Sequence, residues 1–427
     1  MKSNKLALFG GPRVINKPFK KYNTIGDEEI NAAKKVLETG ILSKYLAKWG
    51  DDFLGGPMVK KFEEDWKNKF SVKHAITVNS WTSGLVCAIG AIGVEPGDEV
   101  ILPPWTMSAS AMAILHWNAI PIFADIDPIT YCIDPVSIEK NISSRTKAIM
   151  VVDIGGQSAD MDAINNIAEK HNLKVISDTA QAPGALYKKS FAGTLADIGG
   201  YSLNYHKHIH TGEGGVLVTN DDELAKKLRL IRNHAEAVVG DMGYKDLTNM
   251  IGHNFRLGEI ECSIGIEQLK KLDKLIKSRE YIAKKLNQGL NNLVGLNLPK
   301  IGKNCTHVYY MYFMNLDLSK LKGAKRENIF KALEAEGLKG ISLKFANVHL
   351  LPIFQKKQAY GSNGFPWNSD FARNEISYKK GICPVAETLQ DKNYLGFQMC
   401  MYEMTNKEID YMILSFKKVW NNLELLN

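Results

Sequence analysis

Lys207 is the residue of this chain whose surroundings most clearly indicate chemistry. It stands among the histidines and glycines of positions 202–215, where a long amine side chain has little to pack against. A lysine amine can form an imine with an aldehyde cofactor, and pyridoxal phosphate (PLP) is a cofactor of this kind. PLP also requires a carboxylate beside its pyridine nitrogen, amides and hydroxyls for its phosphate, and a flat or apolar neighbour for its ring.

Asp178 is the candidate for the carboxylate. It ends the short apolar run 174–178, which predicts a buried strand. Ligands of open α/β sheets bind at the carboxyl ends of strands, so an aspartate at this place can keep a pyridine nitrogen protonated. Gln181 follows three positions later, within reach of the 3-oxygen or the face of the same ring. The segment by itself also fits an aspartate that caps a helix.

The candidates for phosphate binding lie in a hydroxyl-rich turn at 79–84, between an apolar run and a helix-like stretch. A strand, a turn and a helix start in this order are typical of an anion site, because amide groups at a helix start are free. Thr82 and Ser83 supply hydroxyls from this turn, and Ser202 supplies another shortly before Lys207. An ordinary Ser/Thr helix cap would have the same appearance.

In this order, the residues resemble the sugar aminotransferases of the DegT/DnrJ/EryC1/StrS family. The resemblance covers almost the whole chain and is specific, because many further segments match in the same order. These segments are 95–101 with Pro103, 125–127, 156–162, 232–234, 252–256 and 264–269.

The resemblance implies a role for each candidate. Lys207 would form the Schiff base with PLP, Asp178 would pair with the pyridine nitrogen, and Gln181 would contact the ring. The phosphate would be held by three hydroxyl residues: Thr82, Ser83 and Ser202.

The family also implies that the active unit is a homodimer. In its members an asparagine of an Asn-x-Arg segment reaches the phosphate of the neighbouring subunit, and this asparagine maps to Asn254. Without the family, Asn254 and Arg256 would be interpreted as an ordinary polar turn.

Two positions depart from the family's common pattern. Trp81 stands in the phosphate turn where the family often has glycine, so the approach of the backbone to the phosphate is expected to differ. Met107 stands where an aromatic residue usually stacks on the cofactor ring. A polarizable thioether can lie against an aromatic face, and the nearby Trp105 is an alternative stacking partner.

The reaction implied is transfer of an amino group from L-glutamate or L-glutamine to a keto-sugar, usually a nucleotide-linked one. Segments 6–12, 359–361 and 383–387 resemble the branch that acts on keto-cyclitols such as inososes, so a keto-cyclitol is the alternative acceptor. A PLP-dependent sugar dehydratase is a further alternative, but such relatives carry histidine where this chain keeps Lys207. Three residues are candidates to approach a diphosphate or ring hydroxyls of the acceptor: Lys344, His349 and Trp367.

Composition excludes several other classes. The 427 residues are 45% hydrophobic, which is enough for a large core and for two domains. The net charge of +8 and the pI near 8.9 are moderately basic, yet the lysines are scattered, so nucleic-acid binding is not expected. The six cysteines form no CxxC pair, which argues against a disulfide framework and against a zinc site.

Metal and membrane binding are not expected either. His206, His208 and His210 alternate in a loop without cysteine or carboxylate partners at ligand spacing, so we predict no metal site. No amino-terminal stretch has the form of a signal peptide, and no run approaches the roughly 20 apolar residues of a membrane span. The sequence therefore predicts a cytoplasmic enzyme that acts on small molecules.

The elements that must position these residues are an α/β domain and a smaller domain. Short apolar strands alternate with helical stretches from about residue 60 to 270, which predicts a mostly parallel sheet covered by helices on both faces. The family resemblance implies the PLP-dependent, aspartate-aminotransferase-like (type I) fold. The predicted division is an N-terminal arm with active-site mouth segments at 1–58, a large PLP-binding domain at 59–275, and a small C-terminal α+β domain at 276–427.

Three local signals describe the second half of the chain. The segment 268–276 has apolar residues at helical spacing and is expected to bridge the two domains. The segment 308–313 is a predicted strand, and Thr405 is expected to start a helix.

Overall fold

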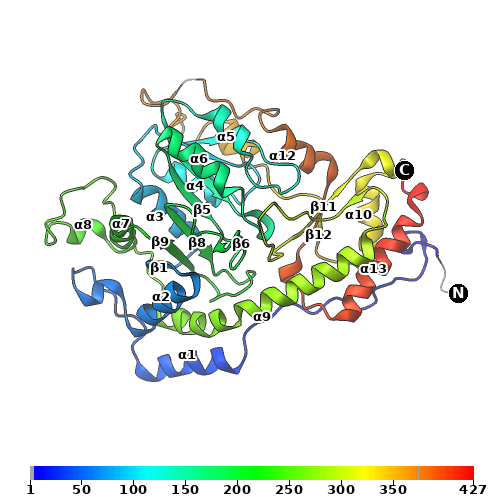
Figure 1. The fold of residues 1–427 in the computed structure, drawn as a ribbon, viewed down its shortest axis with the longest axis horizontal. Helices are drawn as coiled ribbons and strands as arrows, with labels where there is room; N and C mark the ends of the chain where they lie inside the picture. The colour runs from blue at the N-terminus through cyan, green and yellow to red at the C-terminus, as the bar shows by residue number, and fades with distance from the viewer. Residues whose placement is uncertain (1–3, 374) are drawn as a thin grey trace.

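A large, mostly parallel sheet lies between two layers of helices, and a smaller antiparallel sheet lies beside the far end of a long helix (Figure 1). The computed structural model describes residues 4–373 and 375–427. The seven strands of the large sheet follow the order β1-β9-β8-β5-β4-β2-β3. They are β1 (His74–Val78), β2 (Glu99–Leu102), β3 (Ile120–Phe123), β4 (Thr146–Val152), β5 (Lys174–Asp178), β8 (Ile198–Ser202) and β9 (Gly215–Thr219).

Strand direction agrees with the expected α/β architecture. The pairs from β8 through β5, β4 and β2 to β3 are parallel, whereas β9 is antiparallel to both β1 and β8. The carboxyl ends of β1, β4, β5 and β8 therefore meet at one edge of the sheet. The prediction of a mostly parallel sheet covered by helices is confirmed.

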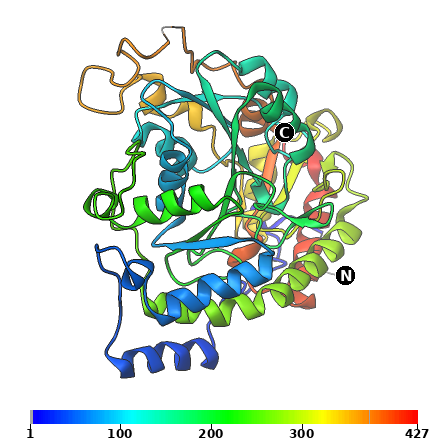
Figure 2. The same ribbon diagram turned by 60° about the vertical axis from the view of Figure 1, so that its left-hand side comes forward.

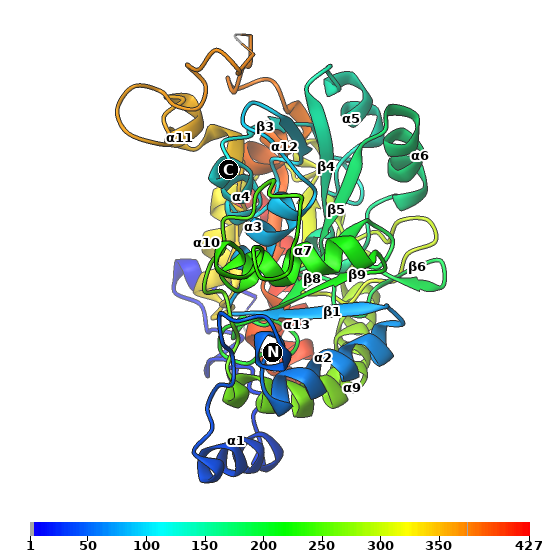
Figure 3. The same ribbon diagram turned by 90° about the vertical axis from the view of Figure 1, so that its left-hand side faces the viewer.

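Side-chain alternation explains why helices cover both faces of this sheet. In β9, Val216 and Val218 pack with the apolar residues of α2 and of the long helix α9 (Glu259–Leu290), whereas Leu217 packs with those of α3 and α7. Figure 3 shows α5 and α6 on the opposite side of the sheet from α3 and α4. The helices around the sheet are α2 (Pro57–Phe70), α3 (Trp81–Ala91), α4 (Ala109–His116), α5 (Pro135–Asn141), α6 (Met161–His171), α7 (Asp222–Arg232) and α8 (Ala235–Val238).

The long helix α9 (Glu259–Leu290) connects the two sheets. Its first half packs against α2, and its second half contributes Ile282, Leu286 and Leu290 to the core around the small sheet. It contains the predicted bridging helix 268–276, so that prediction is confirmed. Helix α1 (Asp27–Thr39) lies along the outer side of α9 (Figures 1 and 2).

The small sheet is antiparallel, in the order β10-β11-β13-β12. Thr405 begins the last long helix as predicted, with a capping box in which the Thr405 amide donates a hydrogen bond to the Glu408 carboxylate. The predicted strand 308–313 starts only at Tyr312, because Tyr309 has a φ of 52° and turns the chain. The elements are β10 (Leu296–Asn297), β11 (Tyr312–Leu316), β12 (Ile341–Ser342), β13 (Tyr394–Phe397), α10 (Arg326–Ala335) and α13 (Asn406–Trp420).

The segment between β12 and β13 returns to the large sheet. It carries α11 (Pro352–Gln355) and α12 (Pro384–Thr388), and its Tyr378 hydroxyl donates to the Pro121 carbonyl of the edge strand β3 at 2.8 Å. Conversely, Leu6 and Ile15 of the amino-terminal segment pack into the core of the small sheet. The predicted boundaries at residues 58 and 275 remain predictions. A short hairpin, β6 (Leu186–Tyr187) with β7 (Ser190–Phe191), completes the strands.

Glu63 of α2 fixes the end of β1 that leads into the site. Its Oε1 accepts hydrogen bonds from the amide and hydroxyl of Thr77, each at 2.9 Å, and from Nη1 of the fully buried Arg232 at 2.9 Å. Replacing Glu63 with alanine leaves the guanidinium buried without its carboxylate, which we expect to cost about 3–5 kcal/mol of unfolding free energy. Urea unfolding followed by circular dichroism measures this cost.

The same helix supplies the control for that prediction. Lys61 pairs with Asp65 on the exposed face of α2. An exposed i,i+4 pair contributes little, so Lys61→Ala should change the unfolding free energy by no more than about 0.5 kcal/mol. Equal urea midpoints for the two variants would show that Glu63 does not have the assigned role.

Candidate active site

The predicted site residues gather where the carboxyl ends of β1, β4, β5 and β8 meet. A cavity of about 190 Å³ opens there. Seven of the nine residues predicted for the site line it: Trp81, Thr82, Met107, Asp178, Gln181, Ser202 and Lys207. Parallel strands bring their carboxyl ends to one edge, so side chains up to 126 positions apart in the sequence meet there.

Lys207 follows β8 in a loop that closes on itself. The Lys207 amide donates to the Asn204 carbonyl and the Thr211 amide donates to the Leu203 carbonyl, so the lysine is held over the cavity. The residue is 7% exposed, and its Nζ lies 4.4 Å from the ring centroid of Tyr310. No ion pair to Lys207 is found among residues 4–373 and 375–427.

Burial sets the protonation of Lys207. It lowers the pKa of the amine to about 8, although the charge of Asp178 opposes this shift. A substantial part of the amine is therefore neutral near pH 8, and the neutral form is the one that acts as a nucleophile or as a base.

Asp178 is the last residue of β5 and is 5% exposed. Its Oδ1 accepts the indole N–H of Trp81 at 2.7 Å, and its Oδ2 accepts the hydroxyl of Ser110 at 2.9 Å. Burial raises the pKa of this carboxyl, and the bonds from Trp81 and Ser110 oppose that rise. No helix follows Asp178 directly, which excludes the alternative of a helix cap.

Gln181 and Asp153 make buried hydrogen bonds near Asp178. Asp153 was not predicted from the sequence. Oε1 of Gln181 accepts the Gly155 amide at 2.9 Å. Asp153, which follows β4, is fully buried and accepts the hydroxyls of Ser177 and Thr179. Burial raises its pKa to about 6. An aspartate after an apolar run was the signal that identified Asp178, and the same signal could have identified Asp153.

The three hydroxyl residues predicted to bind the phosphate differ in their contacts. Thr82 is exposed in the first turn of α3, and its hydroxyl has no partner among the described residues. Ser202 accepts one long bond, from the Asn204 amide at 3.3 Å. Ser83 does not line the cavity, because its hydroxyl donates to Asn79 and its amide to Ser80 in the cap of the helix.

These groups fit PLP. One cavity offers a buried carboxylate together with an amine that has no ion-pair partner and two hydroxyls that have no strong partner among the described residues. The first amides of α3 have no partner within the helix, and they lie at the Thr82 end of the same cavity.

The stacking residue requires a correction. Met107 lines the cavity and is 62% exposed, so its thioether is available to a bound ring. Trp105 is fully buried, stacks on Phe345 at 5.3 Å, and does not line the cavity. The alternative that Trp105 stacks on the cofactor is therefore wrong, because its ring is part of the core.

Asn254 does not reach the cavity of its own chain. It is exposed and forms an isolated antiparallel bridge with Asn233. Of the residues predicted for the site, Asn254 and Ser83 are the two that the fold does not bring to this cavity.

A second cavity of about 440 Å³ adjoins the first and shares His206 with it. It lies between the large and the small sheet and is also lined by Tyr205, Tyr310 and Lys344. Of the three residues predicted to approach the acceptor, Lys344 alone lines it.

The other two acceptor candidates have structural roles in the segment between β12 and β13. His349 is fully buried against Glu387 at 2.9 Å, and the Trp367 indole donates to the Tyr378 hydroxyl at 2.9 Å. The predictions for His349 and Trp367 are wrong, because both side chains are buried inside this segment and neither lines the first or the second cavity.

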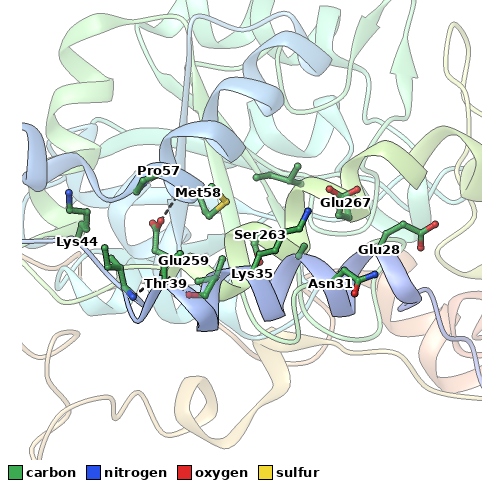
Figure 4. Close-up of a pocket in the computed structure, with 14 residues that line it drawn as sticks. Glu28, Asn31, Lys35, Thr39, Lys44, Pro57, Met58, Glu259, Ser263 and Glu267 are labelled. Atoms are coloured by element: carbon green, nitrogen blue, oxygen red, sulfur yellow. Dashed lines mark hydrogen bonds between the residues drawn. The ribbon is translucent and has the colours of Figure 1, made fainter.

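A larger cavity, of about 560 Å³, lies between α1, α2 and α9 (Figure 4). Glu259 points to the amino terminus of α2 and accepts the Met58 amide at 2.9 Å. None of the predicted site residues lines this groove. The chemistry expected from the sequence therefore belongs to the smaller cavity.

Residues 4–373 and 375–427 contain neither a metal-binding cluster nor a membrane-spanning helix. No group of three or more histidine, cysteine, aspartate or glutamate side chains there could hold a metal ion. No helix in that part of the chain is long and apolar enough to cross a membrane.

The chain is similar to a known protein family and to individual known proteins. The model of the DegT/DnrJ/EryC1/StrS aminotransferase family matches residues 24–386. The chain is 37% identical to GDP-perosamine synthase of Caulobacter vibrioides over 300 residues, which are 70% of this chain and 79% of that protein. It is 34% identical to a Streptomyces kanamyceticus protein assigned as an L-glutamine:3-amino-2,3-dideoxy-scyllo-inosose aminotransferase, over 100% of this chain and 99% of that protein.

A solved structure has the same fold. The aminotransferase from Psychrobacter cryohalolentis matches with a TM-score of 0.78 and 28% sequence identity. The match covers 95% of this chain and 100% of that one.

Proposed function

The chain belongs to the DegT/DnrJ/EryC1/StrS family of PLP-dependent aminotransferases, and from this we propose that it transfers the amino group of L-glutamate or L-glutamine to a ketone on a keto-sugar. Its fold is the type I fold of PLP aminotransferases. The observation that carries the proposal is the presence of Lys207 and Asp178 in one cavity, with the amine partly neutral and the carboxylate held by two donors.

When bound, PLP supplies an electron-withdrawing ring that allows the proton on the carbon next to the amino group to leave. Asp178 would accept a hydrogen bond from the ring nitrogen and keep that nitrogen protonated. Gln181 and Met107 would contact the ring. Thr82 and Ser202 would donate hydrogen bonds to the phosphate, together with the amides at the start of α3.

Lys207 would move the proton in both halves of the reaction. Its neutral Nζ would take the proton from the α-carbon of the amino donor, and its protonated Nζ would deliver a proton to the carbon that bore the ketone in the acceptor. Burial favours the neutral form of this amine, whereas the face of the Tyr310 ring, whose centroid lies 4.4 Å from Nζ, attracts the protonated form.

We assign the acceptor to the second cavity, because it adjoins Lys207 through His206. The Lys344 amine, which is exposed at this cavity, would pair with the diphosphate of a nucleotide-linked keto-sugar. The match to GDP-perosamine synthase supports this acceptor class. A keto-cyclitol is the second candidate, supported by the full-length match to the assigned inosose aminotransferase.

The test begins with the visible absorbance of PLP-loaded protein before and after L-glutamate or L-glutamine. Conversion of the spectrum by one donor, with release of its keto acid, is the expected result. The converted protein is then offered a nucleotide-linked keto-sugar or an inosose, and the aminated product is identified by mass spectrometry.

Lys344→Met should raise KM for the nucleotide-linked keto-sugar and leave KM for the inosose unchanged. Protein that takes up no PLP, or that never converts, would contradict the proposal.

We also propose that the active unit is a homodimer. Large apolar side chains are exposed along α1 and the segment that follows it: Ile30, Leu37, Ile41, Leu42, Leu46 and Trp49. A cluster of this kind is typical of a surface that another chain covers. In such a dimer Asn254 would serve the phosphate site of the partner copy, because it lies away from the cavity of its own chain.

A mixture of one weakened and one inactive variant tests this arrangement. Asn254→Ala alone should lower activity by about 10-fold, because a hydrogen bond to a charged phosphate is lost. Lys207→Met alone should be inactive. Heterodimers prepared by refolding the two together should recover activity, since one of their two sites then has an intact lysine and an intact asparagine. A mixture with no more activity than Asn254→Ala alone would show that the asparagine acts within its own chain.

A further inference from the structure

The carboxylate of Asp178 has an unusual neighbour. Trp81, the first residue of α3, places its indole N–H 2.7 Å from Oδ1 of Asp178, 97 positions away in the sequence. An indole nitrogen can only donate, so this contact requires an acceptor on the other side. On the other oxygen, the Ser110 hydroxyl donates at 2.9 Å and is itself hydrogen bonded to Thr106.

The Asp178 carboxylate has one acceptor position left for a ligand. A carboxylate offers about four acceptor positions. Oδ1 of Asp178 receives Trp81 and, at 3.3 Å, the Ala180 amide, whereas Oδ2 receives only Ser110 among the described residues. The remaining acceptor position is therefore on Oδ2, and the residue lines the cavity. A ring nitrogen that carries a proton is a donor suited to that position.

Glycines make room for the indole. Asp178 pairs with Gly200 on the neighbouring strand β8. A Cβ on Gly200 would lie 2.1 Å from Cζ3 of Trp81, and a Cβ on Gly84 would lie 2.7 Å from its Cε3. The indole thus crosses β8 at a place without a side chain and reaches β5. A tryptophan at position 81 can make this contact only because both positions are glycine.

We propose that Trp81 is a positioning residue whose indole N–H, together with the Ser110 hydroxyl, holds the Asp178 carboxylate as an anion with one acceptor position open to the ring nitrogen of PLP. The carboxylate needs such donors, because burial by itself favours its neutral form. A neutral Asp178 could not keep the ring nitrogen protonated. The part of this inference that concerns PLP rests on the proposed function, whereas the hold of Trp81 on Asp178 does not.

The charged surroundings of Asp178 determine the sign of the pH effect. Lys207 favours the anion, Asp153 opposes it, and His206 and Glu213 line the same cavity. Loss of the Trp81 donor removes one contribution that favours the anion. The pKa of Asp178 should therefore rise, and the acid limb of PLP binding should move to higher pH.

Trp81→Phe removes the donor and keeps an aromatic ring. We expect its affinity for PLP to fall about 10- to 100-fold, since a hydrogen bond to a charged group is lost. Trp105→Phe is the matched control, because that indole is also buried but its nitrogen has no partner among the described residues. It should bind PLP as the wild type does. Ser110→Ala provides a second variant if Trp81→Phe fails to fold, and it should weaken binding in the same direction.

A second measurement needs no cofactor. The indole N–H resonance of Trp81 is identified by its loss in Trp81→Phe, and Asp178→Asn is expected to shift it while leaving the Trp105 resonance in place. An unmoved Trp81 resonance, or unchanged PLP affinity and pH profile in Trp81→Phe, would overturn the inference. If the wild-type protein takes up no PLP, the proposed function fails, and the resonance still decides whether Trp81 holds Asp178.

Discussion

Replacing Lys207 with methionine is expected to abolish amino transfer and, at neutral pH, to make the cofactor-free protein more stable. The loss of activity should be at least about 10³-fold, because the variant has neither the nucleophile nor the base of the reaction. Steady-state assays with donor and acceptor measure this loss.

The gain in stability follows from the pKa of Lys207, which is about 8 in the folded protein and 10.5 in the unfolded chain. The unfolded chain binds the proton more tightly, so the buried amine destabilises the fold. The cost is fully present below pH 8, declines between pH 8 and 10.5, and is absent above that range. At pH 7 it is on the order of 3 kcal/mol, and methionine removes it.

Two control variants separate the effect of the Lys207 charge on stability from its role in the reaction. Lys207→Arg keeps a cation that stays protonated, so it should be inactive without becoming more stable. Lys344→Met removes an exposed lysine and should leave the unfolding free energy unchanged within about 0.5 kcal/mol. Thermal unfolding at pH 7 and at pH 10.5 measures both effects. Activity retained in Lys207→Met, or a stability gain equal at the two pH values, would contradict the assignment.

Asp178→Asn is expected to lower the rate of amino transfer by about 10²–10³-fold, because the amide cannot stabilise a positive charge on the ring nitrogen. The fold should persist, since the amide oxygen still accepts the Trp81 indole and the Ser110 hydroxyl can accept from the amide nitrogen. The rate with saturating PLP separates this effect from weakened binding.

Asp178→Asn is also expected to change the free energy of unfolding in a definite direction. Burial raises the pKa of Asp178, so the carboxylate destabilises the fold once the pH exceeds the pKa of the unfolded chain. The uncharged variant should thus be at least as stable as the wild type at pH 7. Asp197→Asn is the control, because Asp197 precedes β8 at the opposite edge of the sheet. It should keep its activity, and an equal loss in both variants would show a general disturbance of the sheet.

Much of the site could be predicted because its signals are local. Apolar runs of four to seven residues identified strands, and a polar residue directly after such a run identified the side chains at their carboxyl ends. Asp178 was identified in this way, whereas Lys207 was identified by its place among the histidines and glycines of positions 202–215. Their convergence follows from parallel strand direction, which the alternation of strands and helices already predicted.

Contacts between distant segments could not be predicted in this way. The sequence analysis assigned Ser83 to the phosphate, but its hydroxyl is used by the helix cap. It also offered Trp105 as a stacking residue, but this ring packs against Phe345, which belongs to a segment 240 positions later. Such outcomes depend on which side chains compete for the same space.

The sequence by itself thus predicted the fold class and seven of the residues that line one cavity, among them Lys207, Asp178 and Ser202. Backbone direction and side-chain alternation depend on neighbouring residues, so they can be inferred from a short stretch of sequence. The tertiary structure decided that Trp81 holds Asp178. That contact depends on the order in which β1, β9, β8 and β5 lie in the sheet, and strand order is a property of the packed molecule.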